Sequence, residues 1–214
     1  MSLTVNGESA PSIAPVEEGT HLGVCSMLID LGMQYSEIYK KSQRKVLIGW
    51  ELPDETIEID GEMKPRVLSK RYTANLSEKS NLRKDLASWR GRDFTPDELK
   101  AFDLKNIVGA SCLLTIIHSK NGEKTYANIQ SVVKLPKGMA KQALSEPPVV
   151  FDLDTDPLER VEDMPAWIAE LIKKSETYQA RITPPVTTAA NNQPVPDGNT
   201  FQELSDDADG ELPF

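Results

Sequence analysis

The sequence of 214 residues predicts a mainly β domain with short inserted helices, followed by a disordered acidic tail. Three observations lead to this prediction. Runs rich in apolar and β-branched residues recur between turn signals. Two short helical patterns interrupt those runs near the middle of the chain. From Thr183 onward there is no Lys or Arg but there are five prolines, a composition that buries too little apolar surface to fold. We therefore expect a flexible segment over 1–18, a folded domain over 19–178 and a tail over 179–214.

The first three strands are expected over residues 20–31, 45–60 and 66–76. The first is rich in apolar residues, and Gly23 and Gly32 can mark bends in it. The second and third are separated by a short turn, so they are expected to form one extended hairpin.

A first short helix is expected after these strands. Leu82, Leu86 and Trp89 recur at the spacing of one helical face, which assigns Trp89 to the core. Ser77 can cap the start of this helix, and Gly91 can end it.

A second short helix is expected to begin after Thr95. Pro96 stands at its first position and Glu98 at its third, the pattern of a capping box. Phe94 and Leu99 are placed to form a hydrophobic staple over this helix start.

A second hairpin and a last helix complete the fold. Strands over 111–118 and 125–133 are expected to join at Asn121-Gly122, a strong hairpin signal, and the helix to span about 166–175. Trp50 shares a face with apolar neighbours and is assigned to the core. Five antiparallel strands with helices between the third and fourth match an OB-fold-like Greek-key barrel. A generic α+β sheet is the alternative.

The formal net charge of −9 is unevenly distributed. Residues 1–39 hold five acids and no Lys or Arg, residues 40–141 hold 20 basic and 13 acidic residues, and residues 142–214 hold 4 basic and 15 acidic residues. This asymmetry indicates a polyanion-binding body with an acidic tail.

Several functional classes are excluded. Apolar runs are far shorter than the roughly 20 residues of a membrane-spanning helix, and the N-terminus lacks the features of a secretory signal. Cys25 and Cys112 are too few for a disulfide scaffold, so a reduced cytosolic protein is expected. His21 and His118 lie in predicted strands without visible partners. We therefore expect no enzyme activity, cofactor, metal site or membrane partner.

Basic residues alternate with aromatic residues in the middle of the chain, a pattern typical of proteins that bind single-stranded nucleic acid. Lys and Arg follow phosphates, and flat rings stack on bases. Lys70 and Tyr72 share one face of their strand, so Arg71 points the other way. Tyr126 shares a polar strand face with Asn128 and Gln130.

Four blocks of this sequence, residues 69–92, 102–106, 125–129 and 135–138, resemble bacteriophage-encoded single-stranded DNA-binding proteins. The resemblance implies an OB-fold body that coats single-stranded DNA in phage replication or recombination, without catalysis, in the cytoplasm of a host bacterium. Only the basic and aromatic members of the matched blocks are carried over as DNA-binding residues. These are Lys70, Arg71, Tyr72, Arg83, Lys84, Arg90, Arg92 and Tyr126.

The C-terminus resembles the acidic tip of cellular single-stranded DNA-binding proteins, although Ala208 and Gly210 interrupt the acidic run. The resemblance implies a tip that docks on replication, recombination or repair proteins, and an acidic tail can also compete with DNA for a basic groove. The expected partner-binding residues are Asp206, Asp207, Asp209, Glu211, Leu212, Pro213 and Phe214.

Two other functions stay open at this point. The chain could be an interaction adaptor whose tail mimics DNA or captures a host replication or repair protein. A nuclease-like activity is the other, but no metal-ligand cluster is recognisable in the sequence. The oligomeric state is left open, with a homo-oligomer as one possibility.

Overall fold

The computed structural model describes residues 14–59 and 61–183. The expected partner-binding residues, from Asp206 to Phe214, lie outside the described residues. The chain divides into two units, residues 1–183 and 184–214, and the fold described below is that of the first.

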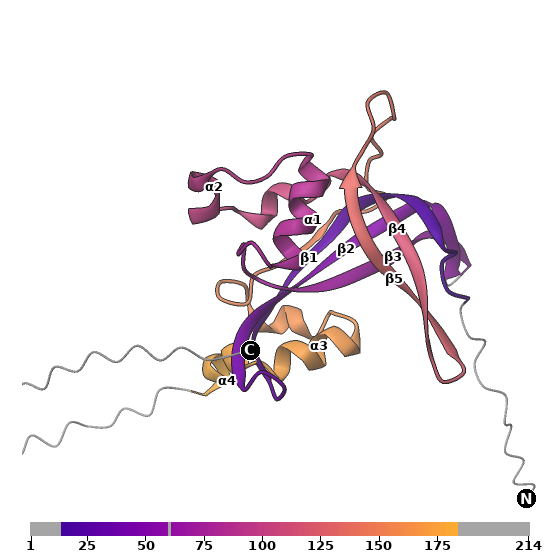
Figure 1. Ribbon diagram of the computed structural model, residues 1–214. Helices are drawn as coiled ribbons and strands as arrows, with labels where there is room; N and C mark the ends of the chain where they lie inside the picture. Colours follow the sequence, from indigo (N-terminus) through magenta and orange to yellow (C-terminus); the bar gives the residue numbers. More distant parts are fainter. Residues whose placement is uncertain (1–13, 60, 184–214) are drawn as a thin grey trace, which may run out of the picture. The chain divides into compact units, whose positions relative to one another are not determined.

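Five strands form an antiparallel sheet in the order β3-β2-β1-β4-β5, with β1 in the middle (Figure 1). A short sixth strand, β6, runs parallel to β1. The strands are β1 (Gly19–Ser36), β2 (Lys41–Ile59), β3 (Glu62–Thr73), β4 (Ser111–Asn121), β5 (Lys124–Lys134) and β6 (Val149–Phe151).

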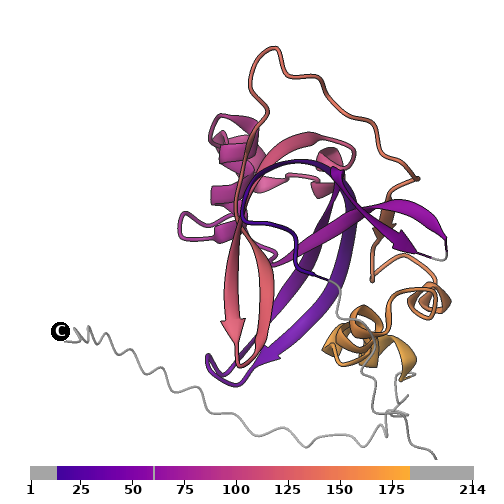
Figure 2. The same cartoon turned by 90° about the vertical axis from the view of Figure 1, so that its right-hand side faces the viewer.

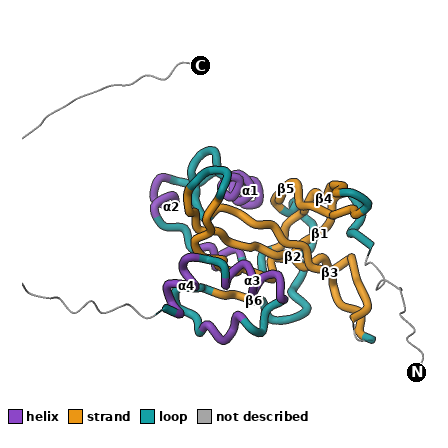
Figure 3. The backbone as a smooth tube through the Cα atoms, turned by 90° about the horizontal axis from the view of Figure 1, so that it is seen from below, coloured by secondary structure: helices purple, strands orange, loops and turns teal. Residues whose placement is uncertain are grey.

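Short helices connect and follow the strands. Those between β3 and β4 are α1 (Asn81–Arg90), α2 (Pro96–Lys100) and the 3-10 helix η1 (Leu104–Ile107). Those after β6 are η2 (Leu158–Val161), α3 (Ala166–Lys173) and α4 (Glu176–Ile182). Figure 3 shows α1 and α2 on one side of β1 and β2, and α3, α4 and β6 on the other.

The five predicted strands and both predicted hairpins are confirmed. β2 and β3 pair along most of their length, with an irregularity between Leu52 and Thr56. β4 and β5 pair up to Asn121 and Lys124, which flank the predicted turn at Gly122. The sequence did not predict β6, because three residues after a proline-rich stretch give no periodic signal.

The first helix buries the predicted face, Leu82, Leu86 and Trp89, and ends at Gly91 as expected. The expected cap was wrong. The side chain of Ser80, not Ser77, accepts the hydrogen bond from the Arg83 N–H. The Ser77 hydroxyl instead donates to Asn75 Oδ1 at 2.8 Å, which closes a turn before the helix.

The capping box of α2 is confirmed, with the Thr95 and Glu98 side chains each bonded to the other's backbone N–H. The expected staple differs, because Leu99 is exposed. Phe94 is buried and packs edge-on against Phe102, with ring centroids 5.1 Å apart.

Two hydrophobic cores lie on opposite faces of β1 and β2, because alternate residues of a strand point to opposite faces. The first core contains Trp50, which is buried as predicted, together with the buried face of α1. The second contains Leu47 and Phe151 together with Ile168 and Ile172 of α3. Both faces of β2 are therefore apolar, as expected for a strand covered on both sides.

The sheet is not closed into a barrel in the described part of the chain. β3 and β5 are its edge strands, and no backbone ladder joins them. A side chain connects them instead, since Lys70 Nζ on β3 donates to the Gln130 carbonyl on β5 at 3.3 Å.

The expected domain boundaries differ from the structure at both ends. Helix α4 crosses the boundary expected between 178 and 179, because the Ser175 side chain caps a further helical turn. Val16, expected in a flexible segment, is buried in the first core. The Glu18 carboxylate also accepts the His118 backbone N–H at 2.6 Å.

Gly32 gives a test of packing around β1. Its φ is +71°, and an added Cβ would lie 2.7 Å from both Leu153 Cδ2 and Ser175 Oγ. We expect Gly32→Ala to lower the free energy of unfolding by about 2 kcal/mol, from left-handed strain and overpacking together.

The matched control is Gly122→Ala, where φ is +61° but no heavy atom lies within 4 Å. This variant carries the backbone strain alone and should lose about 1 kcal/mol. Urea unfolding of both variants measures the difference, and equal losses would contradict the packing argument.

Candidate nucleic-acid interface

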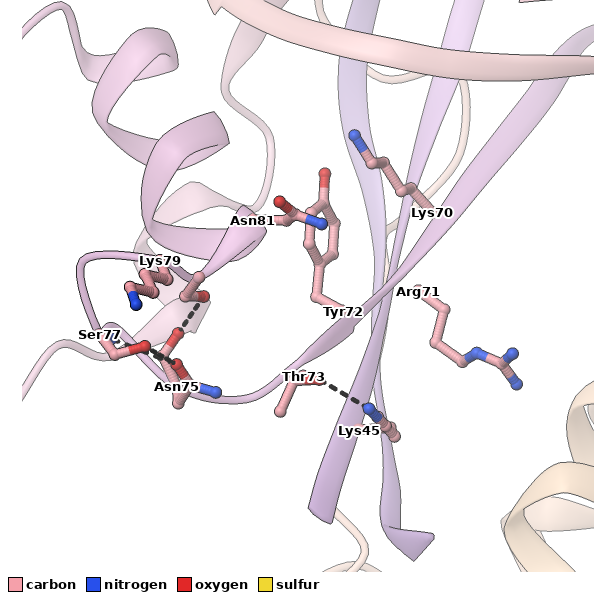
Figure 4. Close-up of a pocket in the computed structure, with 10 residues that line it drawn as sticks. Lys45, Lys70, Arg71, Tyr72, Thr73, Asn75, Ser77, Lys79 and Asn81 are labelled. Carbon is pink, nitrogen blue, oxygen red and sulfur yellow. Dashed lines mark hydrogen bonds between the residues drawn. The ribbon is translucent and has the colours of Figure 1, made fainter. Parts of the chain in front are cut away.

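A basic pocket lies where the end of β3 meets the start of α1 (Figure 4). Its volume is about 330 Å³, and no acidic residue lines it. We call this the basic pocket. It is lined by Lys45, Lys70, Arg71, Tyr72, Thr73, Asn75, Ser77, Lys79, Ser80 and Asn81.

The cations of the basic pocket are close enough to affect each other. Lys45 Nζ donates to Thr73 Oγ1 at 2.6 Å. Burial lowers the pKa of Lys45, and the positive charges of Arg71 and Lys41 lower it further. Neither Arg71 nor Lys79 forms an ion pair with any described residue. Positive charge therefore accumulates here, which favours an anion such as phosphate.

The start of α1 adds to this positive potential. Ser80 caps the helix, and both Ser80 and Asn81 line the basic pocket. The N-terminus of a ten-residue helix carries partial positive charge and free backbone N–H groups. Figure 4 shows Asn75, Ser77 and Lys79 at the same end of the pocket.

Lys70 and Tyr72 do not form the expected exposed groove. Tyr72 is buried in the first core, and its hydroxyl donates to Asp85 Oδ2 at 2.7 Å. Burial raises the pKa of Tyr72, and the Asp85 carboxylate raises it further. Lys70 Nζ donates to the same oxygen at 2.7 Å. Arg71, which leaves β3 on the other side from Lys70, is exposed (Figure 4).

Three of the carried-over arginines are paired with acids. Arg83 binds Asp93 through Nε and Nη2, at 3.1 and 2.8 Å. Arg90 and Arg92 both bind Glu98. The Arg83 hydrogen bond lowers the pKa of Asp93 to about 2. The bond from Arg92 also holds the pKa of Glu98 below its usual range. The charges of these arginines are therefore largely neutralised by neighbouring acids.

Arg90 also packs against aromatic rings. Its guanidinium carbon lies 4.5 Å from the Phe94 ring centroid and 5.2 Å from that of Phe102. This arrangement, with the Glu98 ion pair, fixes the end of α1 against the segment that follows.

The remaining two expected DNA-binding residues are exposed. Lys84 lies on α1 and forms no ion pair within the described residues. Tyr126 is 47% exposed on β5, and Asn128 and Gln130 on the same strand are exposed as well. The predicted residues thus fall into three groups: around the basic pocket, along α1 and just after it, and on β5.

Sequence reasoning missed four residues with suitable chemistry. Lys45 and Lys79 line the basic pocket but stand apart from the densest basic stretch. Tyr35 lies near the end of β1 and Tyr39 in the turn that leads to β2, and they are 52% and 69% exposed. Two tyrosines around a polar turn were the available signal, because such a turn cannot bury both rings.

Three carboxylates, from Asp30, Asp152 and Asp154, have ligand atoms within 4.8 Å of one another. However, Arg44 binds Asp30, and its Nη2 also binds Asp154 at 2.6 Å. The guanidinium supplies the counter-charge that a cation would bring, so this cluster is explained as an ion-pair network.

The thiols and imidazoles occupy structural positions. Burial raises the pKa of Cys25 to about 12 and that of Cys112 further, which disfavours the nucleophilic thiolate. One ring nitrogen of His118 lies 2.7 Å from the Val16 carbonyl, and one of His21 lies 3.0 Å from the Glu17 carbonyl.

Comparisons with known proteins do not assign this chain. No protein-family model matches it, and no curated protein shows significant sequence similarity to it.

None of the helices in the described part has the length and apolar character needed to cross a membrane.

Proposed function

We propose that this protein binds and protects single-stranded DNA without catalysis, with the basic pocket as its main phosphate site. The observation that supports this most is the pocket's lining. It brings together Lys45, Arg71 and Lys79, none of which forms an ion pair with a described residue, in a chain whose net charge is −9. Such a site holds negatively charged oxygens rather than a neutral ligand.

Exposed aromatic rings outside the basic pocket favour a single strand over a duplex. Exposed tyrosines at positions 35, 39 and 126 offer flat rings to unpaired bases. Base stacking of this kind is not available to a duplex, whose bases are already stacked. The strand order and the position of α1 between β3 and β4 also support an OB-fold-like interpretation, although the sheet is open.

The test is a binding titration of the full chain with labelled oligo-dT over a range of salt concentrations. We expect salt-sensitive binding with little sequence preference, and weaker binding to a duplex of the same length. No binding at low salt, by either the full chain or residues 1–183, would rule out the proposal. If oligo-dT does not bind but the tail captures a host protein, the chain is better explained as an interaction adaptor.

The acidic tail is proposed to recruit replication or recombination proteins and to compete with DNA, in the bacterial cytoplasm. Residues 184–214 contain six acids and no Lys or Arg. We expect a chain of residues 1–183 to bind oligo-dT about tenfold more tightly at low salt, because it lacks an intramolecular polyanion. Unchanged or weaker affinity in this titration would contradict the competition.

A further inference from the structure

A second cavity lies at the opposite end of α1 from the basic pocket. Its volume is about 580 Å³. The end of α1, η1 and the segment after β5 surround it. That segment, residues 135–148, leads from β5 to β6 (Figure 2). We call this the α1-end cavity.

The lining of the α1-end cavity combines an apolar wall with positive charge. Trp89, Phe102, Ile107, Leu135 and Met139 provide apolar surface. The charged lining residues are all basic, and none of the lining residues is acidic. They are Arg90, Lys134, Lys137 and Lys141. A ligand that fits this chemistry has a flat or apolar body and carries negative charge.

Four polar side chains in this cavity are available to a ligand. Lys134, Lys137, Lys141 and Asn106 form no side-chain hydrogen bond or ion pair with any described residue. Arg90 is already engaged by Glu98 through Nη2 and by two phenyl rings, whereas its buried Nη1 has no hydrogen-bond partner among the described residues. The three lysines can therefore bind phosphates, while the Asn106 amide can bind the edge of a base.

The segment of residues 135–148, which carries Lys137 and Lys141, is held in place on both sides of the α1-end cavity. On one side it continues directly from β5. On the other, the Gln142 N–H donates to Ser111 Oγ at 3.2 Å. The Ser145 hydroxyl then donates to Glu51 Oε2 at 2.8 Å. These contacts place Lys137 and Lys141 at the cavity without using their side chains.

We propose that the α1-end cavity is a second subsite for the same DNA strand. It takes a nucleobase against the Phe102 side of its wall, with neighbouring phosphates on Lys134, Lys137 and Lys141. This inference rests on the proposed function. The two pockets are separated by the length of α1, and a ten-residue helix is only about 15 Å long. This short separation favours one nucleic-acid strand that contacts both pockets over an acidic peptide. A strand with repeated phosphates can therefore reach both pockets, which lie at opposite ends of this helix.

The first experiment measures how the affinity of the full chain for oligo-dT depends on salt. The triple variant Lys134→Ala, Lys137→Ala, Lys141→Ala should reduce the slope of log affinity against log salt by about 2, at ~0.7 per phosphate contact. The matched control replaces Lys100, Lys173 and Lys174 by alanine. It removes the same charge from α2 and the end of α3, and should keep the wild-type slope.

The second experiment tests the base contact. Asn106 is exposed, so Asn106→Ala should leave thermal unfolding unchanged while weakening oligo-dT binding about fivefold. The same variant should bind an abasic oligomer as the wild type does, because that ligand has no base edge. Equal losses for both oligomers would overturn the base contact.

The outcomes separate this inference from the proposed function. If the wild-type chain binds no oligo-dT, the proposed function itself fails. If it binds but the triple variant keeps the full salt slope, only the second subsite fails. Binding of a peptide of residues 206–214 that depends on the three lysines, with an unchanged DNA slope, would instead assign the cavity to an acidic peptide.

Discussion

The paired substitution Lys45→Glu and Arg71→Glu is expected to weaken the binding of oligo-dT by about 100-fold at low salt. Each side chain can form a charge-assisted hydrogen bond to phosphate, worth about 1.5–3 kcal/mol, or roughly tenfold or more in affinity. Both residues line the basic pocket, where their charges already affect each other. Arg71 forms no ion pair with the described residues and Lys45 gives up its hydrogen bond to Thr73, so only a small loss of stability is expected. Fluorescence anisotropy with labelled oligo-dT measures the loss.

The matched control for this experiment is the pair Lys100→Glu and Lys174→Glu. It changes the net charge by the same amount on exposed positions of α2 and the end of α3, away from the basic pocket. We expect it to weaken binding only slightly, through the long-range field. A similar loss in both pairs would mean that total charge, and not the basic pocket, determines affinity.

The substitution Asp85→Ala is expected to lower the free energy of unfolding by about 3 kcal/mol. The Asp85 side chain is 16% exposed and accepts hydrogen bonds from the Tyr72 hydroxyl and from Lys70. Its removal leaves a buried hydroxyl without an acceptor and a half-buried ammonium without its counter-charge. Urea unfolding measures the change, and Lys84→Ala, at the exposed neighbouring position of α1, is the control.

The contribution of the Tyr72 hydroxyl can be separated by a double-mutant cycle. In Tyr72→Phe the hydroxyl is absent, so adding Asp85→Ala should cost about 1 kcal/mol less than it does in the wild type. Strict additivity of the two losses would show that the hydroxyl and the carboxylate do not stabilise each other.

The sequence predicted those elements of the fold whose formation depends on residues close together in the chain. The strands, both hairpins and the capping box at Thr95 depend on neighbouring residues, so the pattern revealed them. β6 and α4 were missed because one is too short to show a period and the other depends on a cap at Ser175. The sequence also could not show that the sheet stays open instead of closing into the expected barrel. Closure depends on whether β3 pairs with β5, and these strands are far apart in the sequence.

The candidate site was harder to predict than the fold. Strand alternation correctly placed Lys70 and Tyr72 on one face and Arg71 on the other, but could not say which face is inside. In the structure, the face that carries Tyr72 packs into the core, and Arg71 on the opposite face is exposed. The sequence also could not show that Asp93 and Glu98 neutralise nearby arginines. A count of basic residues therefore overestimates the charge that a ligand meets.

The open sheet has a consequence for self-association. An unpaired strand edge is a template for pairing with another copy of the chain, and long apolar edges promote aggregation. Here β3 contains Pro65, which cannot donate a ladder hydrogen bond, and carries Arg66 and Arg71. β5 begins and ends with lysine. Two copies that met edge to edge would bring like charges together. The cations on these strands thus protect the protein from aggregating through its own edges.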